Sequence, residues 1–175
     1  MTDTPNLAAA SSERVEFIFR RHAETARRLE MPMLVGEWGA YGGQPGTLSP
    51  AWDVVGVFEK LLCGETFWAY FPGIEETPSF PVLQRPYPER VAGELLGYRY
   101  DPEADRFTCR WRERADVTAP TRVYVPGWLD VGEKRIVLDP QGAGYWVVPL
   151  RHGGAGAYLE IAPSGRYTER RLVVE

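Results

Sequence analysis

The amino-acid sequence predicts an α/β region followed by an all-β region. The first half of the chain alternates helix-like and strand-like apolar patterns, in the order helix, strand, helix, strand. The second half contains seven short strand-like runs separated by turn residues, which is typical of an antiparallel β-sandwich. We therefore expect two parts, residues 1–94 and residues 95–175.

The first predicted helix covers residues 13–29. Ser12 and Glu13 supply a capping hydroxyl and an acid in the first turn, and both favour a helix start. Residues at spacings of three and four then fall on one stripe of the helix: Val15, Ile18, Phe19, His22, Ala26 and Leu29. This pattern predicts an amphipathic helix in which His22 is half-buried.

The next two elements are a strand and a second helix. Residues 33–36 form an apolar run without alternation, which predicts a strand covered on both faces, as in a parallel sheet. The helix begins at Ser49, where a capping hydroxyl precedes Pro50, and stops near Gly64. Its apolar residues again recur at helical spacing: Trp52, Val55, Phe58, Leu61 and Leu62. Residues 66–71, rich in aromatics and without a charge, predict another buried strand.

The rest of the chain reads as loop and short strands. Five prolines between residues 72 and 88 exclude long regular structure there and predict a linker or an active-site loop, followed by a helical turn at residues 89–95. The predicted strands are 97–100, 106–112, 121–125, 134–138, 145–148, 157–161 and 170–174. In 106–112 apolar and polar residues alternate, which is the pattern of a strand with one buried and one wet face.

Charge and composition exclude several classes of function. The chain has 20 Lys and Arg against 24 Asp and Glu, a net charge of -4, so we expect no nucleic-acid partner. His22 and His152 have no second ligand at metal spacing, and we expect neither a metal nor a cofactor. Cys63 and Cys109 lie in apolar runs, where a free thiol is favoured over a disulfide. No apolar window approaches ~18 residues, so we expect no transmembrane segment. Residues 1–12 lack a signal-peptide pattern, and the sequence does not indicate a cellular compartment.

Glu37 is the first candidate for chemistry. It lies where a predicted buried parallel strand meets its loop, and enzymes built from alternating strands and helices gather their reacting groups at that end. Gly36 and Gly39 let the backbone approach a ligand or a neighbouring strand, and Trp38 supplies a flat apolar wall. The residues alone leave two other roles open for Glu37, as a capping group or as the partner of an arginine.

Trp68 lies within the next predicted strand, 31 residues after Glu37. If the two strands are neighbours in one parallel sheet, they present an acid and an indole to one cleft. Sugar rings stack on such aromatic faces, although a tryptophan in an apolar strand is more often a core residue.

Three motifs in this order carry a resemblance to a known family. They are residues 34–40 (LVGEWGA), 65–70 (ETFWAY) and 85–88 (RPYP) with 91–93 (VAG), and a β-rich tail containing 121–126 (TRVYVP) follows them. Together they resemble the carboxyl-terminal part of glycoside hydrolase family five, especially its endoglycoceramidase-like members. The likeness runs from about residue 13 to the end of the chain.

The resemblance implies a fold and a function. The fold is part of a (β/α)₈ TIM barrel, its last two βα units, followed by an antiparallel β-sandwich. Glu37 is implied to be the nucleophile of a retaining β-glycosidase, and Trp68, Trp38 and Tyr70 to bind the substrate. The expected substrate is a glycoside or glycolipid with a hydrophobic aglycone, such as a glycosphingolipid or a steryl glucoside.

The second catalytic carboxyl group is not recognisable in this sequence. A retaining glycosidase needs two carboxyl groups ~5 to 5.5 Å apart. In the family the acid/base follows an asparagine, but the sole asparagine here is Asn6, and Glu65, Glu75 and Glu76 lie at unsuitable positions. We therefore expect a fragment that is inactive alone and whose partner is the missing amino-terminal portion of the barrel.

Two other interpretations remain open. The chain can instead be a non-catalytic carbohydrate- or lipid-binding module, in which the sandwich offers Trp111, Trp128, Tyr145 and Trp146. The sandwich can also have a structural role, covering one side of the barrel. Binding of oligosaccharides or lipid vesicles by residues 95–175 alone is expected only for the first of these.

Overall fold

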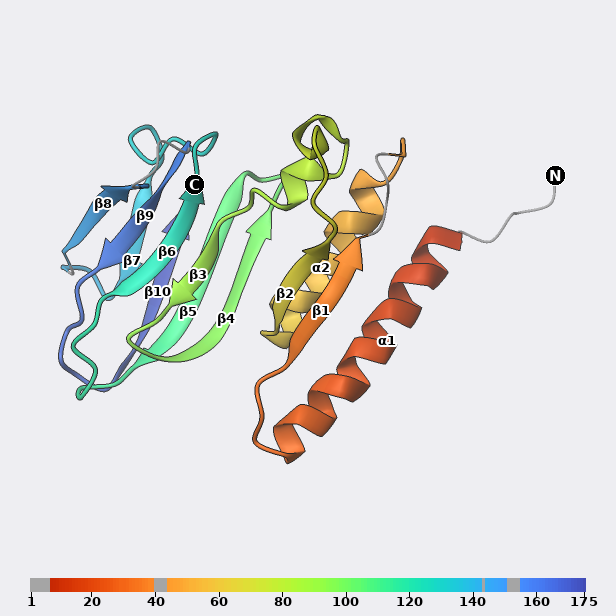
Figure 1. Cartoon of the computed structure of the whole chain (residues 1–175). Helices are drawn as coiled ribbons and strands as arrows, with labels where there is room; N and C mark the ends of the chain where they lie inside the picture. Colours follow the sequence, from red (N-terminus) through yellow and green to blue (C-terminus); the bar gives the residue numbers. More distant parts are fainter. Residues whose placement is uncertain (1–6, 40–43, 143, 151–154) are drawn as a thin grey trace. The chain divides into compact units, whose positions relative to one another are not determined.

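The chain consists of two compact units, Met1–Gln84 and Arg85–Glu175. The computed structural model describes residues 7–39, 44–142, 144–150 and 155–175 (Figure 1). The second unit begins at Arg85, so residues 85–94, which the sequence analysis places in the first part, lie in the second unit.

The first unit has the predicted order of elements. It contains α1 (Leu7–Arg28), β1 (Leu34–Gly39), α2 (Leu48–Leu61) and β2 (Gly64–Trp68). The strands β1 and β2 pair in parallel in a two-stranded sheet, and α1 and α2 lie beside it (Figure 1). Helix α2 ends where Leu62 adopts the left-handed conformation, and Cys63 N–H bonds back to the carbonyl of Phe58, as in a common helix C-cap.

One face of the two-stranded sheet packs on the helices. Val35 and Trp38 of β1 are buried in one cluster with Val55 and Phe58 of α2. From α1, Phe19 reaches this cluster, with its ring centroid 5.2 Å from that of Phe58. Helix α1 packs through Phe19 and buries Ala23, so three residues of the predicted stripe, Ile18, His22 and Leu29, are exposed. The expectation of a half-buried His22 is therefore wrong.

The proline-rich stretch is more ordered than a linker. It forms two short 3₁₀ turns, η1 (Ile74–Glu76) and η2 (Phe80–Val82), and the buried Val82 completes the core of the first unit. The expected helical turn at residues 89–95 is wrong. These residues instead end the strand β3 (Tyr87–Arg90) and begin the strand β4 (Gly93–Asp101). The sequence did not predict β3, because its proline and its two charged residues are typical of a loop.

The second unit contains two four-stranded antiparallel sheets. Their orders are β4-β5-β10-β7 and β3-β6-β9-β8 (Figure 1). The remaining strands are β5 (Arg106–Glu113), β6 (Thr121–Pro126), β7 (Ile136–Asp139), β8 (Tyr145–Pro149), β9 (Gly156–Ile161) and β10 (Thr168–Val174). All seven predicted strands are confirmed, with ends that differ by a few residues.

Each sheet of the second unit buries one face, as the layers of a sandwich do. In β5, Phe107, Cys109 and Trp111 are buried while Arg110 and Arg112 are exposed, which confirms the predicted alternation. The other sheet buries apolar residues of β6 and β9 in the same way, among them Val123, Val125, Leu159 and Ile161. Cys63 and Cys109 are both buried free thiols, and burial raises the pKa of Cys109 to about 12.

Candidate active site

Glu37 lies on the face of β1 that the helices do not cover. Its neighbour Trp38 is buried against α2, and Glu37, next to it in the strand, is exposed on the other side. The register between β1 and β2 shifts between Val35 and Trp38, so Glu37 lies in an irregular part of the pairing. The Thr66 hydroxyl donates a hydrogen bond to the carbonyl of Gly36 and ties β2 to β1 at this irregular place.

Trp68 lies on the same face as Glu37. Phe67, one residue earlier, packs on Trp38 with ring centroids 5.2 Å apart, and this contact assigns Phe67 to the helix-covered face. Because side chains alternate along a strand, Trp68 belongs to the opposite face, where it is 55% exposed. Gly39 pairs with Trp68 at the carboxyl end of both strands. The acid and the indole therefore lie on the same face of the sheet, towards the carboxyl ends of the two strands.

Trp38 does not share this face. It is 7% exposed, and its ring centroid lies 5.5 Å from that of Phe58 and 5.2 Å from that of Phe67. Trp38 thus supports β1 from behind, as part of the core of the first unit. Tyr70 lies two residues beyond the end of β2 and is 80% exposed, and the peptide bond between Trp68 and Ala69 is cis.

No second carboxylate of β1 or β2 accompanies Glu37. Glu65 pairs with Val35, whose side chain is buried on the helix-covered face, so Glu65 lies on the face opposite Glu37. Glu75 and Glu76 are exposed in η1, outside the sheet. Among the side chains of β2, alternation assigns Thr66 as well as Trp68 to the face of Glu37. The sequence analysis did not single out Thr66, although the two-residue period of residues 64–68 would have indicated its face.

Neither a metal cluster nor a membrane-spanning helix is present among the described residues. Among residues 7–39, 44–142, 144–150 and 155–175, no group of His, Cys, Asp and Glu side chains has the arrangement of a metal site. Within these same ranges, neither helix has the length and apolar character needed to span a bilayer.

The chain is similar to known glycoside hydrolases. Residues 85–155 match the family described as the C-terminal domain of glycoside hydrolase family 5. Endo-glycoceramidase II from Rhodococcus sp. is 25% identical, with a TM-score of 0.67, over 87% of this chain and 35% of that chain. Its lactosyl-enzyme intermediate aligns with a TM-score of 0.66 at 24% identity, over 87% and 35% of the two chains.

A second solved structure shares the fold at lower identity. Sterylglucosidase 1 from Cryptococcus neoformans is 16% identical, with a TM-score of 0.60, over 83% of this chain and 28% of that chain. No significant match is found among curated proteins. The chain spans about a third of the length of the endoglycoceramidase that it matches. The chain thus resembles the carboxyl-terminal part of an endoglycoceramidase, and its residues 85–155 match the C-terminal domain of glycoside hydrolase family 5.

Proposed function

We propose that this chain is the carboxyl-terminal part of a retaining β-glycosidase in which Glu37 is the nucleophile. The observation that carries the proposal is the placement of Glu37 and Trp68 on the uncovered face of two paired parallel strands. The carboxyl ends of such strands are where barrel enzymes assemble their active sites. One structural relative was solved as a lactosyl-enzyme intermediate, a state in which the sugar is attached to that enzyme.

The chemistry is a double displacement. The Glu37 carboxylate attacks the anomeric carbon, the bond to the aglycone oxygen breaks, and a glycosyl ester forms. A second carboxyl group protonates the departing oxygen and then removes a proton from the water that hydrolyses the ester. Since Glu65 lies on the opposite face, this acid/base comes from residues outside β1 and β2.

The first unit then represents the last two βα steps of a (β/α)₈ barrel. In the described part of the chain, β1 and β2 each have one neighbouring strand, and a sheet of this size is barely stable alone. Phe17, Ile18 and Leu34 are 61%, 45% and 66% exposed, which is costly for residues of this size. We assign these edges and apolar side chains to contacts with the missing amino-terminal portion of the barrel.

The proposed substrate is a glycoside with a hydrophobic aglycone. One structure of the related endo-glycoceramidase II is a complex with ganglioside GM3, and the fungal relative is a sterylglucosidase. In the present chain Trp68 offers a flat exposed ring beside Glu37, and Tyr70 a second exposed ring beyond β2. We assign Trp68 and Tyr70 to substrate binding and Trp38 to the support of the strand.

Covalent trapping tests the role of Glu37 directly. The protein with its barrel completed is incubated with an activated fluorosugar β-glycoside, and the labelled peptide is identified by mass spectrometry. We expect the label on Glu37, and the Glu37→Gln variant should lose turnover by at least about 10³-fold. Glu75→Gln, which changes an exposed carboxylate of η1, is the matched control and should keep both label and turnover. A label on another residue, or full activity of Glu37→Gln, would refute the assignment.

A further inference from the structure

Three tyrosines form a continuous row across the second sheet of the sandwich unit. Tyr87 of β3 pairs with Tyr124 of β6, and Tyr124 pairs with Tyr158 of β9. Directly paired residues of antiparallel strands point to the same face, and the ring centroids are 5.2 and 6.2 Å apart along the row. The row lies on the outer face of the sheet, because the alternate residues Val123, Val125 and Leu159 are buried in the core.

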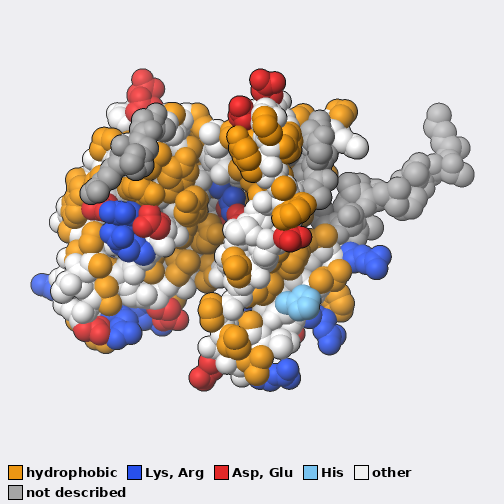
Figure 2. Space-filling view, in the orientation of Figure 1, with side chains coloured by type: hydrophobic (Ala, Val, Ile, Leu, Met, Phe, Trp, Pro, Cys, Tyr) orange, Lys and Arg blue, Asp and Glu red, His pale blue; other side chains and the backbone are white. Residues whose placement is uncertain are grey.

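A second row of polar side chains runs beside the tyrosines on the same face. Arg122 pairs with Glu160, and Glu160 pairs with Trp146 of β8, which is 44% exposed. Arg122 Nε donates a hydrogen bond to Glu160 at 2.6 Å, and its guanidinium lies over the ring of Tyr158, 4.8 Å from the centroid. In Figure 2, which has the orientation of Figure 1, hydrophobic side chains lie beside a group of basic and acidic side chains over β6 and β9.

The charges of this face are fixed and balanced. Arg90 lies 3.6 Å from Glu160 and 3.6 Å from Glu89, and Arg122 lies 3.5 Å from Glu89, so two guanidinium and two carboxylate groups form one network. Each ionic group is held by at least two partners, which keeps it in place. The side chains of Arg122 and Glu89 are 27% and 35% exposed, whereas that of Glu160 is 9% exposed. The network has no net charge with which to attract an anionic membrane surface or a nucleic acid.

We propose that this outer face of β3, β6 and β9 is a binding site for a neutral oligosaccharide. We name it the tyrosine row, Tyr87, Tyr124 and Tyr158, with Arg122 and Glu89 as its polar border. The apolar C–H faces of sugar rings stack on aromatic rings, and their hydroxyl groups both donate and accept, so they match a border that contains carboxylates and guanidinium groups.

Geometry favours a sugar chain over other occupants. Three adjacent strands at ~4.8 Å spacing give a row about 10 Å long, enough to lie under two sugar rings. The rings belong to strands of a sheet, so little conformational freedom is lost on binding. A lipid surface, in contrast, favours apolar groups that insert into it, whereas every ring of this row carries a hydroxyl and lies beside ion pairs. The site is distinct from Glu37 and does not depend on the proposed glycosidase activity.

Calorimetric titration of the full chain with cellotetraose, maltotetraose and lactose tests the proposal. We expect at least one of these neutral sugars to bind, and Tyr124→Ala and Tyr158→Ala each to weaken that binding about tenfold. Tyr124→Phe keeps the ring and should retain most of the affinity. Tyr167→Ala removes a 71% exposed tyrosine outside the row and is the matched control. Thermal unfolding of each variant identifies any that fails to fold, and Tyr87→Ala at the edge strand then replaces it.

Several outcomes would overturn the proposal. One is the absence of binding by all three sugars, and another is equal binding by the wild-type chain, Tyr124→Ala and Tyr87→Ala. Loss of binding in Trp68→Ala with retention in Tyr124→Ala would transfer the sugar to the face of Glu37. Stronger binding to phosphatidylcholine vesicles than to the sugars, lost in Tyr124→Ala, would replace the sugar by a lipid surface. A failure of covalent trapping at Glu37 leaves each of these expectations unchanged, so the two proposals are tested separately.

Discussion

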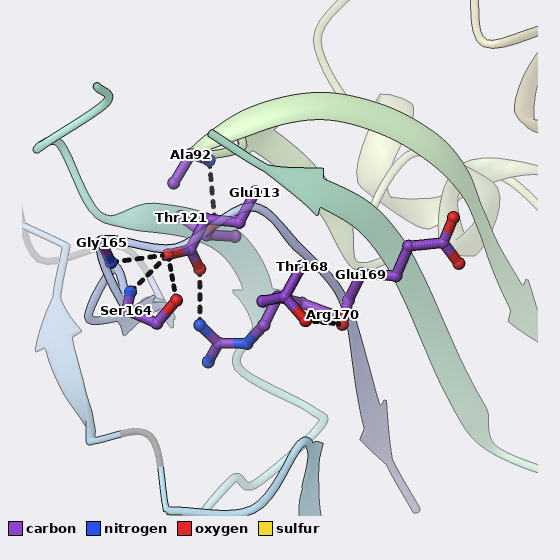
Figure 3. Close-up of polar contacts among 8 residues, drawn as sticks. All are labelled: Ala92, Glu113, Thr121, Ser164, Gly165, Thr168, Glu169 and Arg170. Atoms are coloured by element: carbon purple, nitrogen blue, oxygen red, sulfur yellow. Dashed lines mark hydrogen bonds and ion pairs between the residues drawn. The ribbon is translucent and has the colours of Figure 1, made fainter. Parts of the chain in front are cut away.

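Arg170 and Glu113 form an ion pair inside the second unit, with Nη1 of the arginine 2.5 Å from Oε2 of the glutamate and both side chains 1% exposed. The other carboxylate oxygen accepts hydrogen bonds from the hydroxyl and N–H groups of Ser164 and from the N–H group of Gly165 (Figure 3). One carboxylate therefore joins β5, β10 and the loop before β10.

Glu113→Ala should strongly destabilise the second unit. The substitution leaves the charge of Arg170 buried without its partner, and removing one partner of a buried ion pair costs about 3–5 kcal/mol. The free energy of unfolding is measured by urea titration of the full chain. Glu169→Ala is the control, because Glu169 is 55% exposed in its ion pair with Arg112 and should cost below about 1 kcal/mol. Equal losses in the two variants would contradict the importance of burial.

Stability should fall in acid through the same carboxyl group. Burial by itself would raise the pKa of Glu113, but the hydrogen bonds from Ser164 and the charge of Arg170 outweigh it and hold the pKa below its usual value of 4.5. A carboxyl group whose pKa is lowered by folding stabilises the protein above the unfolded pKa. This contribution is lost as the pH falls below about 4.5, through the folded pKa.

Unfolding free energies from neutral pH to about pH 3 check this expectation. Glu113→Gln cannot titrate at this position, so its stability should depend less on pH than that of the wild-type chain over the acidic part of the range. An unchanged slope in Glu113→Gln would assign the acid sensitivity to other carboxyl groups.

Truncation of Trp38 and of Trp68 should have different effects on stability and on activity. Trp38→Ala opens a cavity against Phe58 and Phe67 and is expected to cost about 3–5 kcal/mol of folding free energy. Trp68→Ala removes a 55% exposed ring and should leave stability nearly unchanged. In the completed enzyme the second variant should instead lower kcat/KM by at least about tenfold, because the sugar loses its stacking partner. The reverse pattern would exchange their roles.

Two glycines of β4, Gly93 and Gly97, differ in the space around them. A Cβ on Gly93 would lie 2.1 Å from the carbonyl oxygen of Arg112, and its φ of +149° disfavours side chains, so Gly93→Ala should cost at least about 2 kcal/mol. A Cβ on Gly97 would have no atom within 4 Å, so Gly97→Ala should leave the free energy of unfolding nearly unchanged. Thermal unfolding of the two variants distinguishes them, and a similar loss in both would indicate that the close approach at Gly93 is relieved by a backbone shift.

The sequence alone determined the local elements and the chemical candidates of this protein. The three- and four-residue spacing of apolar positions was enough to predict the helices, and the run at residues 33–36 and the alternation at 106–112 were enough to predict strands there. The expectation that the first of these strands is covered on both faces is wrong for the described residues, because Leu34 is 66% exposed. Glu37 stood out because it follows an apolar strand-like run, and Trp68 because it lies in the next such run. These signals are local, so they can be recognised in the sequence without knowing which other elements a segment packs against.

The tertiary structure decided which face each residue occupies and which strands are neighbours. Alternation separates Glu37 from Trp38 but does not say which side the helices cover, and the contact of Trp38 with Phe58 settles it. Strand β3 and the tyrosine row depend on hydrogen bonds to β6, more than thirty residues away in the chain. The burial of Glu113 likewise depends on Arg170 in another strand. Which strands pair, and which face a neighbouring element covers, depend on contacts between distant segments, so the periodicity of one segment does not encode them.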